Sequence, residues 1–434
     1  MILFRNFANI FLITELRKRI LFTLGVLAID RLGTYIPVIG INVSMVGEYM
    51  KRSTAAGGLL GYLDVFSGGA LSKCTLFALG IMPYITASIM MQILTMSVPQ
   101  LELLMKEGEY GRKVINQYTR YLALFLSVMY SSSYVAFLES AGLVMTPGWS
   151  FRFLFVLSLT VGSLFVMWLG DQISLYGIGN GSSLIVFAGI VSRFPEMIIK
   201  TKALIDVGTI QLWHAIIMAL IFLIITASIV FLEKGERKVP VQYARRVVGN
   251  RVYGGQTSYI PFKINVTGIM PVIFASSILQ FPTTISLALS HIPFFAWIAQ
   301  VLAPGGVVFN VLEFWLILFF SYFYTALIFN PEELADNIKK SGGFVPGLRP
   351  GRKTAEFFNY ILHRIGLIGA LYLAALVLVP NLLYAYFKLP LSGTSLLIVV
   401  GVALETFAQI ESYLIENRYE GFLTTGRLKA RAAR

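Results

Sequence analysis

Charged residues and cysteines are scarce in this chain of 434 residues. Only 13% of its residues are charged, about half the roughly 25% of an ordinary soluble domain. Because 56% are hydrophobic, a water-soluble globule of this size would lack the polar surface to cover itself. The single cysteine, Cys74, excludes an intrachain disulfide. These scarcities exclude a soluble enzyme, a disordered chain, a collagen and a disulfide scaffold, and they predict an integral membrane protein.

The sequence also lacks the groups that carry catalysis or hold cofactors. Its histidines, His214, His291 and His363, are far apart and have no ligand-like spacing, which argues against a metal site. No G-x-x-x-x-G-K-[ST] loop occurs, so no ATP site of that type is predicted. The glycine-rich segment 177–181 opens an apolar stretch and follows no strand, so we interpret it as a tight turn. We expect neither an enzyme nor a bound cofactor or metal.

Ten apolar stretches have the length that a membrane span needs, ~20 residues. They cover residues 20–36, 74–97, 117–138, 151–170, 182–199, 211–232, 264–286, 309–330, 361–380 and 394–415. Two halves of five spans, 20–205 and 206–434, must be inverted relative to one another if they share a fold. No sequence repeat supports this, so it rests on the span count. Residues 1–19 predict a short helix on the cytoplasmic membrane surface, the alternative being a disordered tail.

The basic residues are concentrated on one side of these predicted spans. If the N-terminus is cytoplasmic, 26 Lys and Arg lie on the cytoplasmic side and 8 on the opposite side. The positive-inside rule then places both termini in the cytoplasm. Half of the 26 belong to two long loops that contain Gly and Pro turns, residues 233–263 and 331–360. The count for the second loop includes Arg364, just beyond its end. We favour docking of a large anionic partner, an acidic protein surface or RNA, over contact with lipid headgroups.

One irregular segment, 56–73, lies between the first and second spans. Its apolar run of about a dozen residues is too short to cross a membrane, and paired glycines bracket it at 57–58 and 68–69. Such backbone is tolerated at membrane depth only when it is buried in protein or lines a cavity. The residues alone leave two interpretations equal, an external loop resting on the helix ends or a re-entrant half-helix in a cavity.

Nine specific segments spread over most of the chain carry a family pattern. They are 66–72 (FSGGALS), 78–85 (ALGIMPYI), 111–121 (GRKVINQYTRY), 177–181 (GIGNG), 271–277 (PVIFASS), 323–331 (FYTALIFNP), 335–342 (ADNIKKSG), 344–351 (FVPGLRPG) and 393–400 (GTSLLIVV). In these segments the chain closely resembles the SecY subunit of the bacterial protein-conducting channel. The resemblance implies an all-α integral membrane protein with ten transmembrane helices. They would form two inverted five-helix halves around an hourglass pore, with a re-entrant plug helix at about 58–72.

The resemblance implies a pore constriction made of a ring of branched apolar side chains. Matched motif by motif, the ring falls on Ile81, Ile85, Val186, Ile273 and Ile398. Ile81 and Ile85 are four residues apart and share one helix face, as a constriction requires. A further position falls on Ser182, which departs from the apolar pattern. The ring is therefore one member short, or the serine turns aside.

The resemblance also implies a plug and a lateral gate. The plug residues are Leu60, Leu63, Phe66, Gly68, Gly69 and Leu71. The gate is a seam between the second and third spans on one side and the seventh and eighth on the other. Its predicted residues are Thr86, Gln92, Ser277 and Phe281, with Ser276 and Gln280 as further candidates for hydrogen bonds.

The resemblance explains why no ATP site is predicted, because it implies that a partner supplies the energy for transport. The SecA motor ATPase and the translating ribosome are expected to dock on Arg246, Arg251 and Arg349. Weaker docking candidates, chosen from charge and position, are Lys238, Arg245, Arg352 and Lys353. The other expected partners are the small membrane subunits SecE and SecG, signal peptides, the translocating polypeptide and lipids. The expected location is the bacterial plasma membrane.

Two other functions are alternatives to a protein channel. A secondary transporter with 5+5 inverted repeats would need buried ionisable groups. The candidates we identify are few, Asp30 with Arg31 and Glu405. Neutralising Glu405 would abolish coupling in a transporter and would affect a protein channel mildly at most. A passive structural or assembly protein would need neither an aliphatic ring nor a plug.

Overall fold

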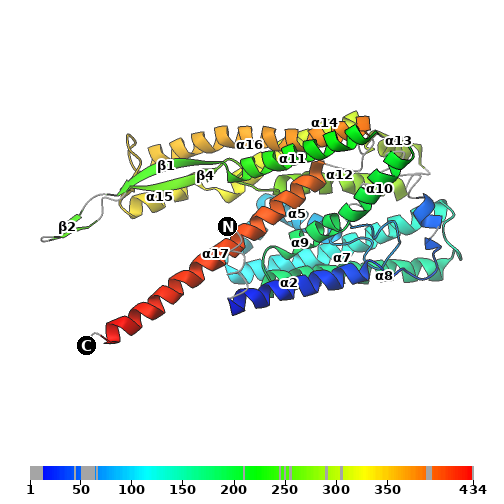
Figure 1. The fold of residues 1–434 in the computed structure, drawn as a ribbon, viewed down its shortest axis with the longest axis horizontal. Coiled ribbons are helices and arrows are strands. Elements are labelled where there is room, and N and C mark those ends of the chain that lie inside the picture. Colours follow the sequence, from blue (N-terminus) through cyan, green and yellow to red (C-terminus); the bar gives the residue numbers. More distant parts are fainter. Residues whose placement is uncertain are drawn as a thin grey trace. The chain divides into compact units, whose positions relative to one another are not determined.

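A computed structural model describes residues 13–43, 45–49, 64, 67–208, 211–243, 246–248, 251–253, 257–288, 292–303, 306–387 and 393–432. Most of this part of the chain is helical (Figure 1). The helices are α2 (Thr14–Gly33), α5 (Met82–Ser97), α6 (Pro99–Lys106), α7 (Glu109–Ser140), α8 (Trp149–Tyr176), α9 (Gly181–Val191), α10 (Phe194–Asp206), α11 (Leu212–Lys234), α12 (Met270–Ala288), α13 (Pro293–Val301), α14 (Val307–Ile328), α15 (Pro331–Lys340), α16 (Arg352–Phe387) and α17 (Gly393–Ala432).

Seven helical stretches in the described part of the chain are long and apolar enough to cross a membrane. They are Glu109–Ser140, Trp149–Tyr176, Gly181–Ala203, Leu212–Lys234, Val307–Lys340, Arg352–Asn381 and Gly393–Ile415. Helices α5 and α6 add an eighth if the pair, bent by 99°, counts as one span. Pro99 accounts for the bend, because proline lacks an N–H and keeps the residue before it out of the helical conformation. The remaining predicted spans, 20–36 and 264–286, overlap α2 and α12.

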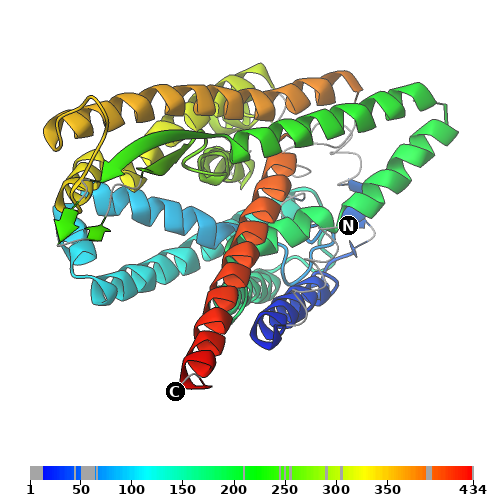
Figure 2. The same ribbon diagram turned by 60° about the vertical axis from the view of Figure 1, so that its left-hand side comes forward.

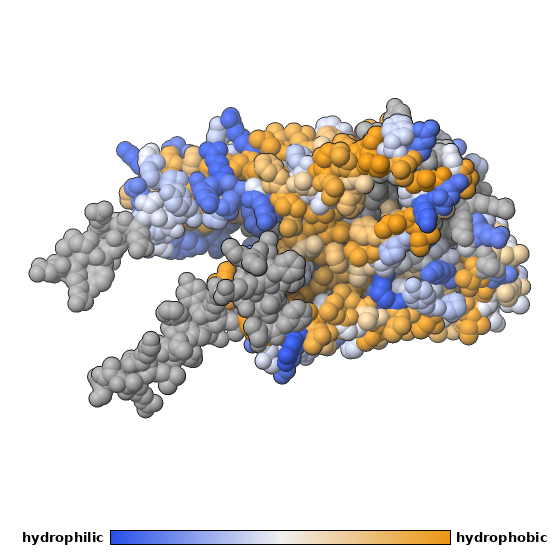
Figure 3. Space-filling model, viewed as in Figure 1, coloured by the Kyte–Doolittle hydropathy of each residue, from blue (hydrophilic) through white to orange (hydrophobic). Residues whose placement is uncertain are grey.

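Large apolar side chains lie on the outside of the long helices. On α11 the exposed ones are Leu212, Trp213, Ile216, Ile217, Leu220, Leu223, Ile224 and Phe231. Hydrophobic residues dominate the face shown in Figure 3 over the long helices, and hydrophilic residues gather around α15 and the neighbouring strands. Exposed apolar surface of this extent needs lipid or protein to cover it, so the protein is a multi-pass membrane protein.

The described chain forms two compact units, and the first comprises Met1–Ala203, Ser277–Gly306 and Val402–Arg434. Its helices α7 and α8 are joined by buried hydroxyl groups: Ser127 donates to Ser163 at 3.3 Å, and Ser131 and Thr160 lie 3.5 Å apart. Such small polar residues let helices approach closely inside a membrane. Helix α9 starts at Gly181, whose Cα faces the carbonyl group of Gly170 on α8 so closely that a side chain would collide with it.

The second unit comprises Leu204–Ser276 and Val307–Gly401. Helices α11 and α16 run alongside each other in it, as both Figure 1 and Figure 2 show. Beyond α11 the chain forms a three-stranded antiparallel sheet of order β4-β1-β5, made of β1 (Glu236–Tyr243), β4 (Thr257–Lys263) and β5 (Gly343–Phe344). A separate pair, β2 (Arg246–Val248) with β3 (Arg251–Tyr253), lies between β1 and β4 in sequence.

The strands in the two long loops were not predicted from the sequence, which indicated only loops with turns. The alternation of buried and exposed residues that is typical of a strand is present in β1. Val239 and Val241 point into a small core, while their neighbours are exposed. Pro240 obscures it, since proline is rare in a central strand. Here β5 pairs only with Gln242 and Tyr243, so Pro240 has no strand partner on that side. The predicted helical membrane fold is therefore confirmed, and the two loops add a small sheet that was not predicted.

Candidate functional site

Three of the predicted ring residues belong to the first unit. Ile81 directly precedes α5, Ile85 lies in its first turn, and Val186 lies on α9; all three are buried. The amide N–H of Ile85 donates to the carbonyl of Ile81 at 3.1 Å, which places both side chains on one helix face. Gly170 on α8 makes room for Ile81, because a Cβ there would lie 3.1 Å from the Ile81 Cδ1 atom.

The other two ring residues belong to the second unit, where α12 and α17 carry Ile273 and Ile398. Both side chains are buried, as are those in the first unit, and the five exposed fractions lie between 1% and 8%. Gly401 on α17 lies against Ile269, the residue directly before α12, since a Cβ at Gly401 would collide with the Ile269 side chain. Ile273 is one helical turn from Ile269, and Ile398 is three residues from Gly401. A single ring made from both units remains a prediction.

The departure at Ser182 has a local explanation. Asn180 is the N-cap of α9, and its Oδ1 accepts from the backbone N–H groups of Ser182 and Ser183 at 3.1 and 3.4 Å. The Ser182 hydroxyl also donates to this Oδ1, at 2.6 Å. The Ser182 hydroxyl is therefore hydrogen-bonded within the helix cap. This favours the interpretation that the serine turns aside from the predicted ring.

Half of the predicted plug residues fall in the described part of the chain. Gly68 and Gly69 have φ angles of 66° and 87°, a left-handed conformation that favours glycine, and Leu71 is buried. Residues 67–74 and 76–80 form turns, and Thr75 between them forms an isolated antiparallel bridge with Pro37. A Cβ on Gly68 would lie 3.0 Å from Gly189 on α9, so the two glycines allow the segment to approach that helix. Leu60, Leu63 and Phe66 lie outside the described residues.

Charged side chains connect the plug segment to the rest of the first unit. The carboxylate of Asp64 forms an ion pair with Arg193 at 3.0 Å and accepts from the backbone N–H of Ser72 at 2.8 Å. Both partners of the pair are largely buried. Next to them, Arg31 binds Asp30 at 2.6 Å and donates to Ser192 at 3.1 Å. A buried, hydrogen-bonded pair of this kind is costly to break one partner at a time.

Helix α7 adds an uncharged contact to the same segment. The Tyr134 hydroxyl donates to the carbonyl oxygen of Leu71 at 2.8 Å and lies 2.9 Å from the Cys74 Sγ atom. Both side chains are buried. The segment is thus held by the end of α9 through charge and by α7 through a hydrogen bond.

The predicted gate residues lie on two helices, Thr86 and Gln92 on α5 and Ser277 and Phe281 on α12. The Thr86 hydroxyl donates to the Met82 carbonyl of its own helix at 3.1 Å. The further candidate Ser276 donates in the same way to Ile273 on α12, at 2.9 Å. Each of these two hydroxyls therefore donates to a carbonyl of its own helix. The side chain of Phe281 is outside the described part.

The predicted docking residues surround the sheet of the second unit. Arg349 is exposed in a turn that begins with Gly347, at φ 84°, and ends with Gly351, at φ 105°. Its carbonyl accepts from the Thr354 hydroxyl at 3.0 Å, which fixes the turn to the start of α16. Among the described residues Arg349 forms no ion pair, so its charge remains open to a partner.

The remaining docking candidates differ in how far their charge is compensated. Arg352 and Lys353 both pair with Glu356, at 3.5 and 2.8 Å, and Lys238 pairs with Glu236 at 3.1 Å. Arg246 lies on β2 and Arg251 on β3, and the side chains of both lie outside the described part of the chain. Arg245 lies outside the described residues.

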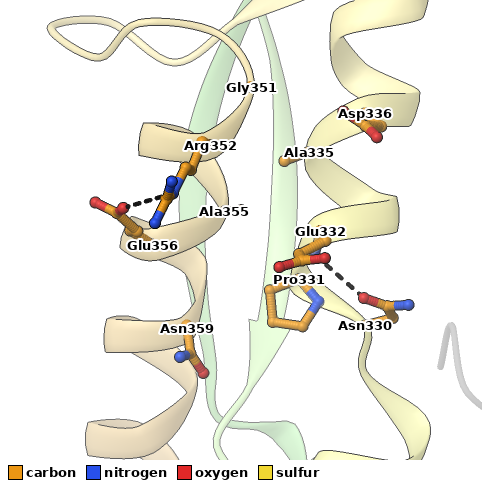
Figure 4. Close-up of a pocket in the computed structure, with 10 residues that line it drawn as sticks. All are labelled: Asn330, Pro331, Glu332, Ala335, Asp336, Gly351, Arg352, Ala355, Glu356 and Asn359. Carbon is orange, nitrogen blue, oxygen red and sulfur yellow. Dashed lines mark hydrogen bonds and ion pairs between the residues drawn. The ribbon is translucent and has the colours of Figure 1, made fainter.

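The same region contains a cleft that the sequence did not predict. It has a volume of about 590 Å³ and lies between α15 and the first turns of α16. Figure 4 shows acidic Glu332 and Asp336 on one wall and Arg352 bound to Glu356 on the other. The prediction of docking residues rested on the excess of basic residues, so it did not include Glu332, Asp336 and Glu356.

A buried acid was also missed. Glu313 lies in α14, and its side chain is completely buried, whereas the predicted deep acid, Glu405, is only half-buried. The sequence signal was present, because Glu313 directly precedes the charge-free stretch 314–329 of the eighth predicted span. An ionisable residue inside an apolar helix is unusual enough to be examined as a functional residue.

These features define a class of protein. Several helices are able to cross a membrane, and the candidate site consists of buried aliphatic side chains instead of reactive groups. A polar extension of strands and helices presents an exposed arginine. Together they are typical of a multi-pass helical membrane protein with a polar extension outside its apolar helices.

Comparisons with known proteins identify the family. The model of the SecY family matches residues 75–407. The protein translocase subunit SecY of Streptomyces scabiei is 45% identical over 433 residues, which cover 96% of this chain and 99% of the relative. The chain therefore belongs to the SecY family.

Solved structures show the same fold at low sequence identity. A solved protein-conducting channel matches with a TM-score of 0.68 and 20% identity, covering 91% of this chain and 92% of that one. Sec61 in the canine ribosome-channel complex from the endoplasmic reticulum matches with a TM-score of 0.64 and 19% identity over the same shares. The fold is thus that of the ten-helix channel proteins, as the sequence predicted.

Proposed function

We propose that this chain is the channel-forming subunit of a protein translocase. It conducts unfolded secretory polypeptides across the membrane and releases hydrophobic segments sideways into lipid. The observation that carries the proposal is the burial of all five predicted ring residues, on four elements of a chain that belongs to the SecY family. A ring of aliphatic side chains opposes ion passage by dewetting and makes no directional bonds, so it can yield around any passing side chain.

The plug gives a second closure on the non-cytoplasmic side of the ring. The contacts of Asp64 with Arg193 and of Leu71 with Tyr134 support a segment held in place by specific bonds. An incoming chain would have to replace these bonds to move it. Sideways release follows from the hydrophobicity of a passing segment of ~20 residues, which gains free energy in lipid. The proposed exit is the seam between α5 and α12, with Thr86 and Phe281 on its two sides.

The channel is not an enzyme, and a partner supplies the energy. Arg349, exposed in a glycine-bounded turn, is the docking residue that the described geometry supports best. We assign the partner role to the SecA motor ATPase and to the translating ribosome, and we expect SecE and SecG as companion subunits. One solved neighbour is a channel in complex with a ribosome. The bacterial relatives support a location in the bacterial plasma membrane. The concentration of basic residues on one side of the predicted spans supports both termini in the cytoplasm.

Resting ion conductance in a planar bilayer tests the proposal. Ile85→Asn introduces a polar group among the ring residues of the first unit, and Ile398→Asn does the same in the second unit. We expect both variants to raise the ion leak of the purified complex. Leu223→Asn on the exposed side of α11 is the control and should leave the leak unchanged. Unchanged conductance and ion selectivity in both ring variants would refute the ring assignment.

A further inference from the structure

A carboxylate, an amide and a helix start lie together inside the second unit. The Asn381 Nδ2 group donates to the Glu313 Oε2 atom at 3.1 Å, and the Asn381 Oδ1 atom accepts from the Gly393 backbone N–H at 3.2 Å. Glu313 belongs to α14, Asn381 to α16, and Gly393 is the first residue of α17. One amide side chain therefore connects three helices.

The chemistry of the three groups fixes the direction of this chain of bonds. The first N–H groups of an α-helix have no partner within the helix, so Gly393 needs an external acceptor. Asn381 meets this need with its carbonyl oxygen, which turns its NH₂ group toward Glu313. The Glu313 Oε2 atom accepts the hydrogen bond that this NH₂ group donates. Glu313 thus holds the Asn381 amide in the one orientation that caps α17.

The burial of Glu313 makes this contact unusual. It lies six residues after the start of α14, about 9 Å along the helix axis, and its side chain has 0% exposure. Within the described residues its second oxygen, Oε1, has no hydrogen-bond partner. A buried polar pair of this kind adds little net stability compared with apolar packing. Its directional bonds instead define where the helix that they cap begins.

The start of α17 is also seated tightly against α16. A Cβ on Gly393 would collide with the Val377 carbonyl oxygen, and Thr394 next to it is completely buried. Ile398 follows Gly393 by five residues on the same helix. A shift of the helix start is therefore transmitted to Ile398 within about one and a half turns.

We propose that Glu313 is a positioning residue for α17: it orients Asn381, which caps the helix that carries Ile398. The consequence for the pore rests on the function proposed above, in which Ile398 belongs to the ring. The capping contact itself is independent of that function, so the two are tested by different measurements.

Hydrogen exchange of the amides of residues 393–398 in the purified complex measures the cap. Glu313→Leu removes the acceptor, and we expect exchange in this segment to rise about tenfold. Glu313→Gln retains an acceptor oxygen and should stay near wild type. Asn381→Asp places two carboxylates against each other and should behave like Glu313→Leu. Adding Glu313→Gln to it restores a donor opposite an acceptor and should restore slow exchange.

The double variant keeps the test decisive if a single variant fails to assemble. Rapid exchange in Glu313→Leu together with rescue in Glu313→Gln/Asn381→Asp supports the proposal. Wild-type exchange in Glu313→Leu, or no rescue in the double variant, would overturn it. The resting leak is measured in parallel, and we expect it to rise with exchange. Altered and rescued exchange beside a normal leak would support the cap and count against Ile398 as a ring residue.

Discussion

The two compact units carry the same kind of candidate residue, a buried branched aliphatic side chain, but they surround it with different chemistry. In the first unit, glycines at close helix contacts and a buried ion pair border Ile81 and the plug segment. In the second unit, an uncharged amide bound to a carboxylate caps the helix of Ile398, and a polar sheet extends from the same unit.

This difference suggests a division of tasks. An ion pair between Asp64 and Arg193 links a segment of turns to a helix end, so it can be broken and remade when the segment moves. The cap of α17 instead joins residues of three helices, Glu313 of α14, Asn381 of α16 and Gly393 of α17. We therefore expect closure to depend on the first unit, and placement of the ring and partner docking to depend on the second.

Charge reversal in the Asp64–Arg193 ion pair should have the largest effect among the variants that test this difference between the two units. Arg193→Glu leaves two buried carboxylates facing each other, which costs about 3–5 kcal/mol in pairs of this kind. We expect the plug segment to detach and the resting ion leak of the complex to rise strongly. The leak is measured in planar bilayers, with protease sensitivity of residues 64–76 as a second readout.

A matched pair of variants separates this effect from general damage. The double reversal Asp64→Arg/Arg193→Glu should recover part of the closure. Arg152→Glu breaks a more exposed pair with Glu139 in the same unit and should change the leak little. A tight channel in Arg193→Glu would show that the pair does not hold the plug.

Glycine contacts in the first unit give a smaller effect. Gly181→Ala forces α9 away from α8, because the new Cβ would overlap the Gly170 carbonyl, and overpacking costs about 1–3 kcal/mol. We expect a lower thermal unfolding temperature of the complex. Gly25→Ala in α2 is the control, since a Cβ there meets nothing within 4 Å and should be neutral or slightly stabilising. Equal unfolding temperatures for both variants would contradict the close-contact role of Gly181.

Docking in the second unit should be separable from closure. Arg349→Glu is expected to reduce SecA- or ribosome-driven transport by about fivefold, since a single exposed charge contact contributes on the order of 1 kcal/mol. The resting leak and the unfolding temperature should not change. Arg352→Glu serves as the comparison, because Arg352 is already paired with Glu356. Normal transport by Arg349→Glu would remove the docking assignment.

The sequence predicted the features that depend on composition and motif. Ten apolar stretches overlap helices of the structure, and the five ring positions came from short motifs and prove to be buried. The predicted halves, 20–205 and 206–434, remain a prediction, because the compact units have other boundaries. The plug and gate residues likewise remain predictions.

Features that depend on long-range contacts were not predicted. Asp64 and Arg193 are separated by 129 positions, and Glu313 and Asn381 by 68, so no local pattern relates them. Pro240 obscures the pattern of alternating buried and exposed residues in β1, so this strand was not predicted. The cleft with its acidic residues was not predicted, because the prediction for these loops rested on their net positive charge. Such contacts follow from tertiary packing, which a single sequence does not reveal.

Cross-linking of a stalled translocating chain tests the central claim, the aliphatic ring, most directly. Cys74 is first replaced by serine, which retains a partner for the Tyr134 hydroxyl and leaves the chain without cysteine. Single cysteines are then introduced at the five ring positions, with Leu124 and Leu223 as exposed apolar controls. We predict cross-links from all five ring positions and none from the controls. Cross-links at the controls and none at the ring would contradict the proposed path.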